Sequence, residues 1–134
     1  MGGITGLHTD LRRIYGQPYY YNATETGTDE YTYGGQADDN FLAADLSGRA
    51  PFNAAVSRFD VLWNTSYRSI NNASAIIENG TEAEMPAELI AEARFFRAFH
   101  YFLLTQSFGG VPLDLGSGIL QANSNPTPFS ERNT

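Results

Sequence analysis

The sequence predicts an all-α fold, and three observations indicate it. Apolar residues recur at three- and four-residue steps in three segments, glycine or proline follows each segment, and no strand pattern is comparably strong. The 134 residues suffice for one compact domain or for a piece of a larger one. A hydrophobic fraction of 42% against 17% charged residues provides enough apolar surface for a core.

The first predicted helix spans residues 4–15. It places Leu7, Leu11, Ile14 and Tyr15 on one face, and it ends at Gly16 and Pro18. Residues 16–52 are rich in Tyr, Gly, Asn, Asp and Thr and lack a sustained apolar period, which predicts a long ordered loop. A short helix or a hairpin around 39–46 is one possibility within that loop.

The second predicted helix spans residues 53–79. Asn53 is the expected N-cap, and Asn79-Gly80 is the expected left-handed stop. Its apolar stripe comprises Phe59, Leu62, Trp63, Tyr67, Ile70, Ala73 and Ile77. Trp63 shares this stripe, so its phase favours a place in the core over a role as an exposed stacking platform, whereas Asn64 lies one step around, toward solvent.

The third predicted helix spans residues 86–108, with Pro86 in its first turn and Gly109-Gly110 closing it. Between positions 95 and 104, eight of ten residues are apolar or aromatic and surround the helix, which predicts burial on most sides. Arg94 and Arg97 are expected to be structural, paired with a carboxylate or stacked on Tyr101. The other two helices can cover about half of the perimeter, so further helices outside this chain are expected to cover the rest.

The second and third helices are joined by a short turn and form an antiparallel pair of the kind found in helical repeats, although the tetratricopeptide consensus is not matched. Residues 114–134 form a polar tail rich in Gly, Ser, Asn and Pro, which is typical of a linker.

Charge and composition exclude several functions. The net charge is −7 and the basic residues are scattered, which argues against binding nucleic acid or an anionic membrane surface. Without cysteine there is no disulfide, thiolate zinc site or cysteine nucleophile. His8 and His100 accompany no ligand-spaced acidic cluster, so no metal is expected, and no apolar run approaches the roughly 18 residues of a membrane span.

Two segments resemble a known family. Residues 92–102 (EARFFRAFHYF) and 108–113 (FGGVPL) are similar to the SusD/RagB family of outer-membrane glycan-binding lipoproteins from Bacteroidetes. Leu62-Trp63-Asn64, Tyr67 and Ile70 look like the preceding helix of that family, and Thr28-Asp29-Glu30 resembles its acidic loop motif.

The resemblance implies a SusD-like helical fold with tetratricopeptide-like helix pairs, of which this chain is an N-terminal portion. It also implies a cell-surface protein without catalytic activity, held at the outer membrane by a lipidated cysteine that is missing from this chain. No cofactor is expected. Such a protein captures oligosaccharides for a TonB-dependent, SusC-like transporter. A helical-repeat module that docks onto a protein and has no sugar site is the alternative.

The candidate glycan-binding residues are Asp29, Glu30, Tyr31, Tyr33 and Asn64. Sugar recognition needs flat aromatic faces together with carboxylate or amide groups for paired hydroxyls, and the loop supplies both. The tyrosines of the loop have an alternative interpretation, in which they pack the loop onto the helices. Adjacent carboxylates do not define the separation that glycoside hydrolysis requires, so a hydrolase is not expected.

Overall fold

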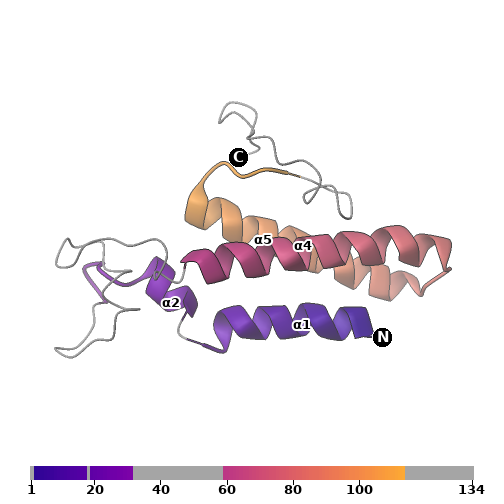
Figure 1. The fold of residues 1–134 in the computed structure, drawn as a ribbon, viewed down its shortest axis with the longest axis horizontal. Helices are drawn as coiled ribbons and strands as arrows, with labels where there is room; N and C mark the ends of the chain where they lie inside the picture. The colour runs from indigo at the N-terminus through magenta and orange to yellow at the C-terminus, as the bar shows by residue number, and fades with distance from the viewer. Residues whose placement is uncertain (1, 18, 32–58, 114–134) are drawn as a thin grey trace. The chain divides into compact units, whose positions relative to one another are not determined.

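The computed structural model describes residues 2–17, 19–31 and 59–113. Within these ranges the helices are α1 (Gly2–Tyr15), α2 (Tyr19–Thr24), α4 (Phe59–Glu82) and α5 (Ala87–Phe108), and no β-strand is found there. The all-α prediction is therefore confirmed. Figure 1 shows α4 and α5 side by side along most of their length.

The predicted helices agree with α1, α4 and α5, with shifted ends. α1 begins two residues earlier than predicted, at Gly2, and α5 begins one residue after Pro86. The predicted start of the second helix, including the Asn53 cap, lies outside the described residues, as do Tyr33, the 39–46 segment and the polar tail 114–134. The short helix α2 was not predicted, because the one helix or hairpin considered within residues 16–52 lay around 39–46.

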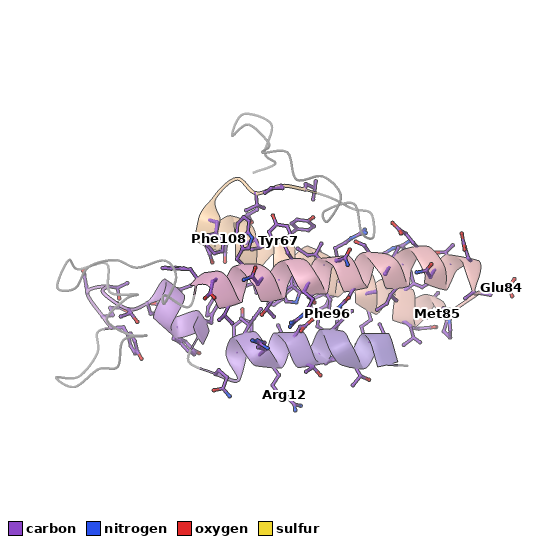
Figure 2. All side chains as sticks on the ribbon, in the orientation of Figure 1. Arg12, Tyr67, Glu84, Met85, Phe96 and Phe108 are labelled. Atoms are coloured by element: carbon purple, nitrogen blue, oxygen red, sulfur yellow. The ribbon has the colours of Figure 1, made fainter. Side chains whose placement is uncertain are left out.

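The prediction that Asn79-Gly80 ends the second helix is wrong. α4 continues to Glu82, and Gly80 lies buried inside it. A Cβ atom at Gly80 would lie 3.3 Å from Met85 Sδ and 3.5 Å from Ile90 Cγ1. Glycine at this position therefore allows the side chains of Met85 and Ile90 to pack close to the backbone of α4. The turn is made instead by Glu84, which has a φ of 50°. Glu84 and Met85 form the tip of the helix pair in Figure 2.

The predicted stop of the third helix at Gly109 is confirmed. Gly109 has a φ of 72°, in the region that glycine adopts without steric cost, and its N–H donates to Thr105 O at 3.0 Å.

The chain forms two compact units, Met1–Asp10 with Ser66–Thr134, and Leu11–Thr65. In the first unit, α4 and α5 are antiparallel, as predicted. His100 Nδ1 lies 3.3 Å from Ser66 Oγ, whereas Arg97, three residues earlier on α5, donates to Ser74 Oγ, eight residues later on α4. The rings of Tyr67 and Tyr101 meet edge to face at 6.4 Å, and the Tyr67 hydroxyl donates to Pro112 O.

Residues 2–10 of α1 belong to this unit, and they pack against both α4 and α5. His8 Nε2 lies 2.7 Å from Glu92 Oε1, and its ring meets Phe96 at 4.8 Å. Asp10 accepts a hydrogen bond from Arg68. Figure 2 shows Phe96 on the side of α5 that faces α1. The apolar core of this unit consists of Leu7, Ile70, Ala73, Ala93, Phe96, Leu103, Leu104 and Val111.

Among the described residues, only one side of α5 is buried. Ala93, Phe96, His100, Leu103 and Leu104 are buried on it, but Phe95 is 59% exposed and Phe102 is 52% exposed. The prediction of burial on most sides is therefore wrong for the described residues, because only the side that packs against α1 and α4 is buried. Arg94 is exposed rather than buried, and Arg97 is half-buried with its bond to Ser74.

Candidate functional site

The second unit carries a tyrosine cluster formed by Tyr15, Tyr20 and Tyr21. α1 ends at Tyr15, where Gly16 N–H donates to Arg12 O at 2.7 Å, and α2 begins four residues after Tyr15. The Tyr15 and Tyr20 rings lie 4.9 Å apart at a tilt of 39°, and the Tyr20 and Tyr21 rings meet edge to face at 6.2 Å. The break between the two helices thus stacks aromatic rings from both.

The phenol of Tyr15 is held in its neutral form. The pKa of Tyr15 is raised to about 12, first by burial and then by the charge and hydrogen bond of Tyr20 and the charge of Tyr21. A neutral phenol both donates and accepts a hydrogen bond, and Tyr15 is still 40% exposed. The cluster therefore offers an aromatic edge and a hydroxyl to a ligand at neutral pH.

A compact turn, residues 25–31, follows α2 and is closed by four short-range hydrogen bonds. Glu25 N–H donates to Tyr21 O, and Thr28 N–H donates to Glu25 O at 3.1 Å. Gly27 N–H donates to Tyr31 O at 3.0 Å, and Tyr31 N–H donates to Thr28 Oγ1 at 3.2 Å. Gly27 has a φ of 90°, which glycine permits without strain. The turn is thus built by its own backbone and by Thr28.

The turn holds three of the five predicted binding residues at its surface. Asp29, Glu30 and Tyr31 are all exposed, and Tyr31 closes the turn through both its N–H and its carbonyl. Two carboxylates and a phenol are therefore presented together, next to one another in the chain. Thr26, by contrast, is buried.

The other two predicted residues have different outcomes. Asn64 lies exposed on α4, on the solvent side as its phase predicts, while Trp63 is half-buried. Tyr33 lies outside the described residues. No contact that the structure describes joins Asn64 to the turn, so its membership of the site stays a prediction.

Sequence reasoning missed Tyr15 as a member of the tyrosine cluster. Its position in the predicted first helix pointed to a role in that helix alone. The signal that could have found it is the stop at Gly16 and Pro18, because a side chain in the last turn of a helix lies next to the chain that follows.

The described residues contain neither a group of three side chains suited to a metal ion nor a helix long and apolar enough to cross a membrane. What they do contain is an exposed set of aromatic and acidic groups. Tyr15, Tyr21 and Tyr31 are 40%, 53% and 40% exposed, and the carboxylates of Asp29 and Glu30 can accept hydrogen bonds from hydroxyl groups.

Comparison with protein-family models matches residues 9–134 to the SusD-like_3 model, described as "Starch-binding associating with outer membrane". Comparisons with curated proteins and with solved structures found no match. The matched range includes both the tyrosine cluster and the turn, as well as α4 and α5.

Proposed function

Because the chain belongs to the SusD-like family, whose description is starch-binding in association with the outer membrane, we propose that it binds neutral oligosaccharides and performs no chemistry on them. The family match over residues 9–134 is the observation that carries this proposal. We further propose that the complete protein works at the cell surface, lipid-anchored in the outer membrane, and delivers its glycan to a TonB-dependent, SusC-like transporter.

The binding surface that we propose is centred on the turn at residues 25–31. The faces of a pyranose ring are weakly apolar and its rim carries hydroxyl groups, so it combines stacking on an aromatic ring with hydrogen bonds to planar acceptors. Tyr31 supplies an exposed ring, and Asp29 and Glu30 supply acceptors beside it. Tyr33 and Asn64 are proposed as further contacts.

The rigidity of the turn supports this assignment. Tyr31 is tied to Gly27 and to Thr28 through its backbone, so its position is set before a ligand arrives. A preorganised contact loses less conformational entropy on binding than a mobile one does. The same bonds leave the Tyr31 ring itself 40% exposed.

Isothermal titration calorimetry of the chain against a panel of neutral oligosaccharides, beginning with starch fragments, tests the proposal. We expect saturable binding that weakens about tenfold or more when Asp29→Asn or Tyr31→Ala is introduced, because stacking and charge-assisted hydrogen bonds each contribute about 1 to 2 kcal/mol. Glu82 is an exposed acid at the end of α4, so Glu82→Gln, which also replaces a carboxylate by an amide, is the control for Asp29→Asn and should leave binding unchanged.

Two other results would redirect the assignment. Absence of binding across the whole panel would favour the alternative of a helical-repeat module that contacts a protein partner. Release of shorter sugars during prolonged incubation would identify an enzyme. Recovery of a TonB-dependent transporter with the full-length protein from outer membranes tests the delivery step separately.

A further inference from the structure

Two polar atoms buried inside the first unit have no hydrogen-bond partner among the described residues. They are Nε2 of His100 on α5 and Oγ of Ser69 on α4, and both side chains are fully buried. A serine inside a helix can donate its hydroxyl to the carbonyl four residues earlier, here that of Thr65, but Ser69 makes no such bond. Because an unpaired buried polar group costs free energy, both atoms call for a partner.

Asp10 of α1 lies at the same level of the unit as Ser69 of α4. A Cβ atom on Gly3 would lie 3.0 Å from Ile76 Cδ1, so Gly3 and Ile76 face each other across the two helices. Asp10 comes seven residues after Gly3, and Ser69 comes seven residues before Ile76. Seven residues make about two helical turns, so in this antiparallel pair Asp10 and Ser69 also face each other. The ion pair of Asp10 with Arg68 agrees with this register.

His100 of α5 belongs to the same layer. Its Nδ1 lies 3.3 Å from Oγ of Ser66, which precedes Ser69 by three residues on α4. Burial lowers the pKa of His100 and the carboxylate of Asp10 opposes this, so Asp10 lies within electrostatic range of the ring. Asp10 is itself 7% exposed, and Arg68 donates to its Oδ1, which leaves Oδ2 to accept from another donor.

From this layer we infer that the unit binds an internal water molecule, which bridges His100 Nε2, Ser69 Oγ and Asp10 Oδ2. Buried waters typically make about three hydrogen bonds to polar groups that the protein itself leaves unpaired. One molecule in this position would satisfy both unpaired atoms. It would also link α1 to α4 and α5, since each of the three helices contributes one of its partners.

The charge of Asp10 sets the direction of these hydrogen bonds. A carboxylate only accepts, so the water donates one proton to Asp10 Oδ2 and the other to Ser69 Oγ. The water oxygen then accepts from Nε2–H of His100. The neutral imidazole therefore carries its proton on Nε2, and its Nδ1 accepts from the hydroxyl of Ser66.

Nuclear magnetic resonance of the labelled 134-residue chain tests the water directly. We expect nuclear Overhauser cross-peaks between water and the carbon-bound ring protons of His100. Ser69→Ala should weaken them about threefold or more, because the water loses one of its three hydrogen bonds. Ser74→Ala removes a hydroxyl at another buried serine of α4, one that already accepts from Arg97, and should leave them unchanged. A wild-type spectrum without these cross-peaks, or variants that behave alike, would overturn the inference.

Nitrogen-15 chemical shifts of the imidazole at pH 7 test the predicted proton position. The chain has two histidines, so His8→Gln leaves the ring signals of His100 alone in the spectrum. We expect Nε2 to carry the proton and Nδ1 to be the unprotonated nitrogen. A proton on Nδ1 would contradict the inferred hydrogen bond from Nε2 to the water.

Discussion

His100 of α5 lies fully buried against Ser66 of α4, with His100 Nδ1 3.3 Å from Ser66 Oγ. Its other ring nitrogen, Nε2, is buried without a hydrogen-bond partner in the part of the chain that the structure describes. The pKa of His100 is lowered from 6.5 to about 4, because burial outweighs the opposing charge of Asp10, which is itself paired with Arg68. The imidazole is therefore neutral in the folded protein at pH 7.

Acidification should destabilise the fold through His100. The unfolded chain binds a proton near pH 6.5 and the folded chain only near pH 4, so stability from this group is complete above pH 6.5 and declines as the pH falls to about 4. The full loss is about 3 kcal/mol. Urea unfolding at pH 7, 6 and 5 measures it. His100→Leu should remove most of the decline between pH 6.5 and 5, whereas His8→Gln, at an exposed histidine, should retain it. An unchanged decline in His100→Leu would contradict the assignment.

The ion pair between Asp10 and Arg68 should contribute more to stability than the pair between His8 and Glu92. Asp10 is 7% exposed, so Asp10→Ala removes the buried partner of the Arg68 guanidinium and should cost about 1 to 2 kcal/mol of unfolding free energy. The His8 side chain is 58% exposed, and Glu92→Gln should cost less than about 0.5 kcal/mol. Chemical denaturation of both variants at pH 7 compares them. Equal losses of unfolding free energy in the two variants would show that the burial of Asp10 does not make its ion pair more stabilising.

Two glycine-to-alanine changes should have opposite signs. Gly109 has a φ of 72° and a ψ of −135°, which an alanine adopts only with strain, so Gly109→Ala should destabilise the chain by about 1 to 3 kcal/mol. Gly6 is inside α1, and nothing lies within 4 Å of a Cβ atom added there, so Gly6→Ala should stabilise it by about 0.5 to 1 kcal/mol. Thermal unfolding measures both. If Gly109→Ala stabilised the chain, the backbone at the C-terminal end of α5 would have to adopt a conformation that alanine accepts without strain.

The phenol of Tyr15 should titrate at lower pH once Tyr20 loses its hydroxyl. Burial is the larger cause of the raised pKa and Tyr20 the next, so Tyr20→Phe should lower the pKa of Tyr15 while leaving it above 10. Nuclear magnetic resonance of the labelled tyrosine Cζ carbons follows the titration. Tyr31→Phe, in the turn, is the control and should not shift the Tyr15 titration. An unchanged pKa of Tyr15 in Tyr20→Phe would show that the Tyr20 hydroxyl does not affect the titration of Tyr15.

Local signals predicted the elements that depend on local interactions. The apolar period fixed the phase of the three long helices, and Gly109 ends α5 because the residue after the last turn needs a positive φ. The sequence predicted only a long loop around Asp29, although the hydrogen bonds of the turn join residues close in the chain. Asn64 was correctly placed toward solvent by helical phase alone.

The features that sequence reasoning missed depend on tertiary contacts. Gly80 has the appearance of a helix stop, but its contact with Met85 and Ile90 favours glycine inside α4. The six-residue α2 has no apolar period to reveal it, because a helix of that length depends on its surroundings. The exposed side of α5 carries phenylalanine and alanine, as the buried side does, so the presence of these residues could not tell the two sides apart.

The row of small residues on α4 affects how this chain can change during evolution. Ser66, Ser69, Ala73 and Ser74 are all buried, and a larger side chain at any of them would push α4 away from its neighbours. Asp29 and Glu30 are exposed and belong to a turn held by its own backbone, so mutations there leave the helix pair intact. Substitutions at the exposed positions of the turn should therefore be tolerated more readily than larger side chains at the serines.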